Sequence, residues 1–344
     1  MNGPAHPMPH DPLRRHLLNG QVIPAHPLAL TAARTLDEQR QRKLTQYYIN
    51  AGAGGVAVAV HTTQFALRQH GLLRPVLELA STTVAESRSG SDERTFVLIA
   101  GAVGSTREAV AEAAVAADLG YDAVLLSLAG LDHLNDDGLL AHCSAVADVL
   151  PLFGFYLQPA VGGRPLGAAF WHRLAELSRL VAVKIAPFNR YHTHTVVRAI
   201  VESGRDDVAL YTGNDDSIVH DLLTPFPVEV NGAIVHRYMD GGLLGHWAVW
   251  TKSAVRLLRE ARAAREAPVL AARWPRVTAA ITDMNSAVFD AANGFAGCIP
   301  GIHEVLVQAG LLSGAWTLDP EETLSPGQQA EIQRVMRMYP EWTE

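Results

Sequence analysis

The chain alternates apolar, strand-like runs with helix-like runs along most of its length. Such alternation indicates a parallel sheet, because parallel neighbours need a crossover connection that is usually a helix. Each run is almost wholly apolar, as expected for strands that are covered on both faces. We predict eight strands, at residues 21–30, 54–63, 95–105, 122–130, 150–159, 180–187, 207–215 and 228–236.

Eight β-α units predict an α/β protein with a (β/α)8 TIM barrel over residues 20–255. An open, doubly wound sheet is the alternative, but no strand is followed by a GxGxxG fingerprint. Residues 1–19 contain prolines and histidines where a signal peptide would be apolar, and we expect a flexible tail. One long helix is expected over 243–265, and residues 256–344 should form a helical extension packed on the barrel.

Composition narrows the classes of partner. The 344 residues are 48% hydrophobic and 18% charged, which suits a large core, and the formal charge of −7 gives no basic face for nucleic acid. No uncharged apolar run reaches the length of a membrane span. Cys143 and Cys298 are too few for a disulfide scaffold, and we expect buried free thiols in a reducing, cytoplasmic compartment.

Lys184 is the residue that most needs a chemical explanation. It interrupts the apolar strand VAVKIAP, and it is one of only three lysines among 28 basic residues, beside Lys43 and Lys252. Burying an ammonium group is costly, and burial lowers the pKa of a lysine. A neutral amine can attack a carbonyl and form a Schiff base. The alternative is a structural lysine that pairs with a carboxylate of the barrel or reaches solvent.

Polar residues also follow other predicted strands, at the face where such barrels place their active sites. His61 could act as an acid–base near neutral pH, and Arg190 could bind a carboxylate or phosphate. Structural roles for both are the alternative. The candidates for substrate binding are His61, Thr62, Thr63, Asn189, Arg190, Gly213, Asn214 and His236.

A metal site is the competing interpretation of the histidines at the strand ends. His26, His61 and His236 would then lie on one face, as in a barrel hydrolase with a carboxylated lysine. Those enzymes carry a His-x-His pair on the first strand, whereas this chain has only His26 there. The ligand spacing is therefore missing, and we predict no metal.

Three motifs together resemble the dihydrodipicolinate synthase and N-acetylneuraminate lyase family of Schiff-base aldolases. They are Thr62-Thr63 after the second strand, Tyr156 in FYLQP and Lys184 in VAVKIAP. The family carries Gly-Thr-Thr-Gly-Glu, Tyr-Asn-x-Pro and Ile-Lys-Glu at these strands. The resemblance runs from about residue 20 to 255 and marks the chain as a divergent member.

The resemblance implies a role for each matching residue. Lys184 would form the imine with a 2-oxo acid, which is pyruvate in most members, and Tyr156 would relay protons. Thr62 and Thr63 would hold the carboxylate of the 2-oxo acid. The imine would serve as electron sink, so neither a metal nor an organic cofactor would be needed. The family also implies a homodimer or homotetramer.

Departures from the family pattern bear on the second substrate. Gln64 and Phe65 replace the glycine and the acid of the threonine motif, and Ile185 replaces the acid after the lysine. Val161 stands where dihydrodipicolinate synthases keep an arginine, with Arg164 out of register. The fourth strand ends in SLAGL, without the family's relay tyrosine. We therefore expect a substrate other than that of lysine biosynthesis.

The sequence thus predicts a carbon–carbon lyase of the aldolase type, which joins or separates a 2-oxo acid and an aldehyde. Two alternatives stay open. One is a hydro-lyase that ejects a hydroxyl group from a deoxy sugar acid through the same imine. The other is a non-catalytic barrel that binds a 2-oxo acid.

Overall fold

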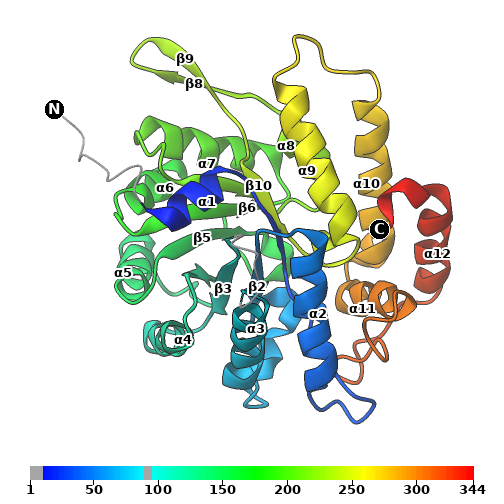
Figure 1. The fold of residues 1–344 in the computed structure, drawn as a ribbon. Helices are drawn as coiled ribbons and strands as arrows, with labels where there is room; N and C mark the ends of the chain where they lie inside the picture. The colour runs from blue at the N-terminus through cyan, green and yellow to red at the C-terminus, as the bar shows by residue number, and fades with distance from the viewer. Residues whose placement is uncertain (1–10, 89–94) are drawn as a thin grey trace. The chain divides into compact units, whose positions relative to one another are not determined.

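A computed structural model describes residues 11–88 and 95–344 of the chain (Figure 1). Eight strands form one sheet in the order β1-β10-β7-β6-β5-β4-β3-β2. An isolated parallel bridge between Ala25 and Ala57 links the two strands at the ends of this order, so the predicted (β/α)8 barrel is confirmed. The strands are β1 (Val22–Pro24), β2 (Gly55–Val58), β3 (Val97–Ala102), β4 (Ala123–Leu126), β5 (Leu152–Leu157), β6 (Leu180–Ala186), β7 (Ala209–Thr212) and β10 (Gly241–Leu244).

One helix precedes the first strand, and others connect the strands and follow the last one. They are α1 (Pro12–Leu18), α2 (Glu38–Ala51), α3 (Leu73–Arg88), α4 (Thr106–Asp118), α5 (Asp136–Ala147), α6 (Ala168–Ala175), α7 (Arg190–Glu202), α8 (Ile218–Leu223), α9 (Thr251–Arg265), α10 (Trp274–Val288), α11 (Cys298–Gln308) and α12 (Gln328–Met338). Short 3-10 turns lie at η1 (His61–Thr63), η2 (Phe65–Arg68), η3 (Pro159–Val161), η4 (His246–Ala248), η5 (Ala291–Asn293) and η6 (Pro340–Trp342).

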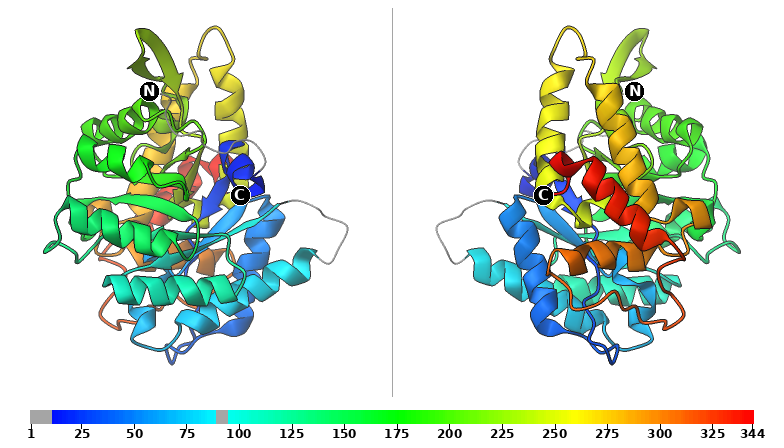
Figure 2. Two further views of the ribbon diagram at one scale, coloured as in Figure 1. Left: turned by 90° about the vertical axis from the view of Figure 1, so that its left-hand side faces the viewer. Right: turned by 90° about the vertical axis from the view of Figure 1, so that its right-hand side faces the viewer.

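The described chain divides into two compact units. The first contains α1 with Ile99–Asn214 and His220–Gly242, and the second contains Val22–Leu98, Asp215–Val219 and Leu243–Glu344. Within the second unit, α12 packs on α10, as Figure 2 shows. The boundary that we expected at residue 255 falls inside α9. The division into a barrel and an extension packed on it stays a prediction.

The predicted eighth strand is wrong. Residues 226–237 form a separate antiparallel hairpin of β8 (Phe226–Val230) and β9 (Ala233–Arg237), and the eighth barrel strand is β10 (Figure 1). The turn is Asn231-Gly232, and both residues have positive φ, 52° and 80°. Asn-Gly is the preferred pair for a two-residue hairpin turn, so the sequence carried the signal. The long helix expected from 243 also begins later, at Thr251.

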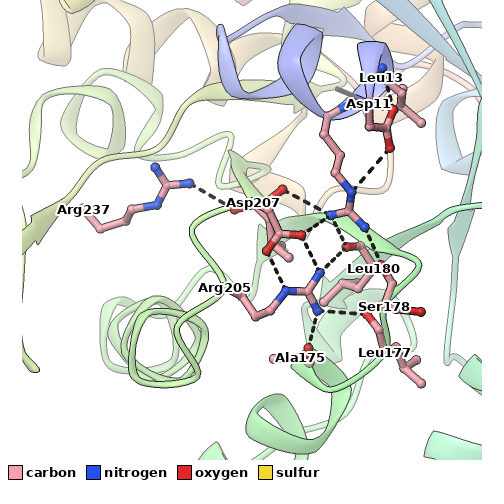
Figure 3. A network of polar contacts seen from close by, with 11 residues as sticks. Asp11, Leu13, Ala175, Leu177, Ser178, Leu180, Arg205, Asp207 and Arg237 are labelled. Carbon is pink, nitrogen blue, oxygen red and sulfur yellow. Dashed lines mark hydrogen bonds and ion pairs between the residues drawn. The ribbon is translucent and has the colours of Figure 1, made fainter. Parts of the chain in front are cut away.

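The N-terminal residues depart from the expected flexible tail where the structure describes them. Residues 1–10 lie outside the described part, whereas Pro12–Leu18 form α1, which Asp11 caps by accepting hydrogen bonds from the amides of Leu13 and Arg14. Arg14 is buried, and its Nη1 lies 2.6 Å from Asp207 Oδ2 (Figure 3). Burial would raise the pKa of Asp207, but Arg205 and Arg14 outweigh it, so the pKa is lowered.

This network joins α1 to the strand that carries Lys184. Arg14 and Arg205 both donate to the carbonyl oxygen of Leu180, the first residue of β6, at 2.9 and 3.1 Å. Arg205 Nε also lies 2.7 Å from Asp207 Oδ1. Two buried cations therefore share one carboxylate and one strand end, and Asp11, 3.4 Å from Arg14 Nε, supplies the second negative charge (Figure 3).

Replacing Arg14 should destabilise the fold through this network. We expect Arg14→Ala to lower the free energy of unfolding by about 2 kcal/mol, because Asp207 keeps Arg205 but loses one charged donor. Urea unfolding measures the loss. The matched control is Arg15→Ala, which removes an exposed arginine from the same helix and should change stability by less than about 0.5 kcal/mol. Equal losses for the two variants would contradict this account.

Candidate active site

Lys184 lies on β6, two residues before the carboxyl end of the strand. It pairs in register with Phe155 on β5 and with Tyr211 on β7. Its Nζ lies 4.6 Å from the centroid of the Phe155 ring, and the side chain is half-buried. The amine therefore sits against an aromatic face, where water can surround it only in part.

Gly213 has no side chain, and the side chain of Lys184 occupies the space that a Cβ would need there. A Cβ at this position would stand 2.6 Å from Lys184 Cε and 2.8 Å from Ala186 Cβ. The Gly213 amide donates to the carbonyl oxygen of Ile185 at 2.8 Å, so the backbone is fixed there. The residue after β7 must therefore be glycine if Lys184 keeps its conformation.

Tyr156 lies on the opposite face of the sheet from Lys184. Side chains alternate along a strand, and Tyr156 pairs with Ile185, whereas Phe155 pairs with Lys184. The Tyr156 ring contacts Trp171 on α6 at 5.2 Å and His192 on α7 at 5.7 Å. Its hydroxyl accepts a hydrogen bond from the Leu166 amide at 3.2 Å. The expectation that Tyr156 and Lys184 converge is thus corrected, and burial raises the pKa of Tyr156.

Thr62 and Thr63 form η1 at the end of β2, together with His61, and both threonines are buried. Thr63 Oγ1 donates to the carbonyl oxygen of His26 at 2.7 Å and accepts from the Val60 amide at 3.2 Å. Thr62 Oγ1 donates to the same carbonyl at a longer 3.4 Å. The two hydroxyl donors that we expected for a carboxylate are therefore turned toward the backbone.

His26, which follows β1, and His61, in η1, differ in their surroundings. His26 is fully buried, and its ring contacts the Pro27 carbonyl at 2.8 Å and Thr45 Oγ1 at 2.9 Å. Burial lowers its pKa to about 4, so it stays neutral and structural. His61 is half-buried and lies against the Phe65 ring at 5.9 Å.

Arg190 is engaged with a carboxylate that the sequence analysis did not single out. It forms an ion pair with Asp221, which is fully buried. Asp221 Oδ2 also accepts from Thr212 Oγ1 at 2.6 Å and from Asn214 Nδ2 at 2.9 Å. This network engages Nη1 of Arg190 and ties α7, α8 and the end of β7 together, while the buried Nη2 of Arg190 has no hydrogen-bond partner among the described residues. In the sequence, Asp221 stands among the apolar residues of α8, and this position could have indicated a buried carboxylate.

Two further candidates, Asn189 and Asn214, accept hydrogen bonds from backbone amides. Asn189 is the N-cap of α7, and its Oδ1 accepts from the amides of Tyr191 and His192. Asn214 Oδ1 accepts from the Phe188 amide at 3.0 Å, where the chain turns with a φ of 51°. These bonds hold the loop that follows Lys184.

His236 does not lie at the end of a barrel strand. It belongs to β9 of the hairpin and is exposed, so the placement on which its candidacy depended is corrected. The reason is the Asn-Gly turn, which folds the expected strand back on itself.

Three findings concern metal binding, membrane spans and the two cysteines. The described residues hold no group of three or more His, Cys, Asp or Glu arranged to bind a metal ion. No helix in the described ranges combines the length and the apolar character that crossing a bilayer requires. Cys143 and Cys298 are free and buried, as predicted, and burial raises the pKa of both thiols.

The two threonines should differ in their contribution to stability. Thr63→Val leaves the His26 carbonyl and the Val60 amide without a short partner in a buried place, and we expect a loss of about 1–2 kcal/mol in the free energy of unfolding. Thr62→Val is the matched control, since its bond is longer, and should cost less than about 0.5 kcal/mol. Chemical denaturation measures both, and a larger loss for Thr62→Val would overturn the assignment.

The model of the dihydrodipicolinate synthetase family matches residues 19–234, which is well over half of the chain. Among curated proteins, the 4-hydroxy-tetrahydrodipicolinate synthase of Synechocystis is 28% identical over 202 residues, which cover 57% of this chain and 62% of that protein. The synthase of Thermosynechococcus vestitus is 30% identical over 209 residues, covering 59% and 66%. The matches span less than two thirds of the length of these relatives.

Solved structures show the same fold. A monomeric dihydrodipicolinate synthase variant superposes with a TM-score of 0.77 at 18% identity, covering 96% of this chain and 99% of that one. A prophage protein of the same family from E. coli K12, solved with pyruvate, gives 0.75 at 19% identity and covers 92% and 97%. Together with the matching family model, this places the chain in the dihydrodipicolinate synthetase family.

Proposed function

We propose that the protein is a Schiff-base lyase in which Lys184 forms an imine with pyruvate or a related 2-oxo acid. The observation that supports this most is the position of Lys184, near the carboxyl end of a parallel strand, half-buried against Phe155 and over a glycine. The carboxyl ends of barrel strands are where such enzymes place their chemistry. The membership in the family adds to this support.

The reaction follows from the chemistry of an amine and a ketone. The uncharged amine of Lys184 adds to the ketone carbon of the 2-oxo acid, and the carbonyl oxygen leaves as water. A base removes the proton of the hydroxyl group on the fourth carbon, the bond between the third and fourth carbons breaks, and its electron pair moves toward the iminium nitrogen to give an enamine. The second fragment departs as an aldehyde. Protonation of the third carbon restores the iminium ion, and addition of water releases the 2-oxo acid and the free amine of Lys184. The reverse sequence joins the two.

The proton transfers of this reaction need a group other than Tyr156. Its ring packs against α6 and α7, and its hydroxyl accepts from the Leu166 amide. Phe155 carries no hydroxyl, and the hydroxyl of Tyr211 donates to the carbonyl oxygen of Leu17. We propose His61 as the general acid–base, because the ordinary pKa of a histidine suits proton transfer near neutral pH. Thr62 and Thr63 remain proposed for the 2-oxo acid carboxylate.

We further propose that the substrate is not that of a dihydrodipicolinate synthase. Those enzymes keep an arginine where this chain has Val161. Arg164 is near in sequence, but its Nη1 donates to the carbonyl oxygens of Leu131 and Leu134 at 3.3 and 2.9 Å. It holds the loop after β4 and does not replace the missing arginine.

Reductive trapping tests the proposed imine. With pyruvate and borohydride, we expect a reduced pyruvyl adduct on Lys184, located by mass spectrometry of peptides. Because the chain has only three lysines, each is assigned separately. Lys184→Met should abolish the adduct and turnover, whereas Lys252→Met, which removes an exposed lysine paired with Glu344, should leave both unchanged. Adduct on Lys43 or Lys252 alone would overturn the proposal.

Screening of aldehydes and deoxy sugar acids then identifies the reaction. Cleavage that releases pyruvate and an aldehyde supports the aldolase. Loss of water without cleavage would indicate a hydro-lyase. Trapping without turnover of any substrate would favour a barrel that only binds the 2-oxo acid.

Gly213→Ala provides a second, steric test. The added methyl group overlaps Lys184 Cε, so the lysine must move from its position over Phe155. We expect the rate of adduct formation to fall at least tenfold, while the far-ultraviolet circular dichroism stays unchanged. The control is Gly167→Ala, where a Cβ meets no atom within 4 Å. An unchanged trapping rate in Gly213→Ala would show that the lysine position is not what permits the reaction.

A further inference from the structure

The hairpin of β8 and β9 has one covered strand and one exposed strand (Figure 1). On β8, Phe226 and Val228 are buried, and α7 packs against this strand. On β9, residues 233–236 are exposed, so both faces of the strand lie in water, and Ile234 and Val235 are 59% and 41% exposed. A two-stranded hairpin is marginally stable in water, and further strands or a covering helix are needed to stabilise it. The hairpin therefore gains stability from a strand that pairs with β9.

The free edge of β9 presents the backbone groups of two residues. β8 and β9 form a two-stranded sheet, so one edge of β9 has no neighbour among the described strands. In an antiparallel pair, hydrogen-bonded and non-hydrogen-bonded positions alternate. His236 pairs with Pro227, which has no N–H, so this is a non-hydrogen-bonded position, as is the pair of Ile234 with Glu229. The N–H and C=O groups of Ile234 and His236 therefore point away from β8.

β9 also lacks the features that keep an edge strand from pairing. Natural edges are protected by prolines, lysines or other charges. Pro227 and Glu229 provide this on β8, whereas β9 reads Ala-Ile-Val-His-Arg, and its one formal charge, on Arg237, is paired with Asp240 at 2.9 Å. Residues 226–237 hold one acid and one arginine, so they are formally neutral in a chain of charge −7. Two copies can therefore meet here without the repulsion that their net charge causes elsewhere.

We propose that β9 pairs with β9 of a second copy of the chain, antiparallel and about a twofold axis at Val235, so that the two hairpins form one four-stranded sheet. In this register Ile234 of one copy lies opposite His236 of the other. Two such pairs form, and in each the outward groups exchange two hydrogen bonds. An axis at Ile234 or at His236 would leave a single pair within β9, because the other outward residue would then face Gly232 of the turn or Tyr238 beyond the strand.

The side chains fit this register. Arg237 falls opposite the small Ala233 of the second copy, so like charges do not face each other across the two strands. Val235 lies opposite its own copy, on the face that it shares with Val228. The four valines then form one row across the sheet, and pairing removes the exposed part of Val235 from water. A twofold contact of this kind is closed, as the expected homodimer or a tetramer built from dimers requires.

A proline at residue 236 tests the backbone pairing in the full chain. His236→Pro removes an outward N–H but leaves the hydrogen bonds between β8 and β9 in place, because this position is not bonded to β8. In sedimentation equilibrium, we expect half the molar mass of the wild type, or a dissociation constant at least tenfold higher. The matched control, His236→Ala, keeps the amide and should shift the dissociation constant by less than twofold. A monomeric wild type, or equal behaviour of the two variants, would overturn the proposal.

Cysteine crosslinking tests the axis without changing the backbone. Across the axis, the Cα atoms of two Val235→Cys chains would lie about 4.5 Å apart, which suits a disulfide. In the control, Ala233→Cys, they would lie about 14 Å apart. The natural thiols, Cys143 and Cys298, are buried. With diamide as oxidant, we expect a covalent dimer from Val235→Cys and none from Ala233→Cys on a non-reducing gel. Equal crosslinking of both variants, or of neither, would refute the pairing.

Discussion

The register between β5, β6 and β7 decides which side chains share a face with Lys184. In a parallel sheet, paired residues point to the same side, and a shift by one residue exchanges the two faces. Phe155 and Tyr211 pair with Lys184, so they and the lysine line one side. Tyr156, one residue further, faces the helices. The backbone hydrogen bonds of the sheet therefore decide which side chains lie beside Lys184. Tyr156 follows Phe155 directly in sequence but lies on the other face.

The polar residues around the ends of β6 and β7 are engaged mainly with one another and with the backbone. Arg190 and Asn214 both contact the buried Asp221, and Asn189 caps a helix. These contacts secure the loops that follow the two strands. They do not satisfy every donor, because Arg190 Nη2 is buried without a hydrogen-bond partner among the described residues.

The lysine strand is secured at both ends by different means. At its start, Arg14 and Arg205 donate to the Leu180 carbonyl and share Asp207 (Figure 3). Near its end, Gly213 packs without a side chain against the lysine stem. Charge therefore fixes the start of the strand, and the missing side chain of Gly213 gives the lysine stem its place near the end.

The order of residues alone was enough to predict the class of fold, and it singled out Lys184 as the candidate for the chemistry. Alternation of apolar runs with helices requires crossovers, and a lysine inside such a run has few explanations. It did not determine the eighth strand, because the short run GGLL carries little strand propensity while the hairpin before it reads as a better strand. Nor could it decide the facing of Tyr156, the pairing of Arg190 with Asp221 or the contact of Gln64 with Leu318. These depend on register and on contacts between residues up to 254 positions apart, which only the tertiary structure brings together.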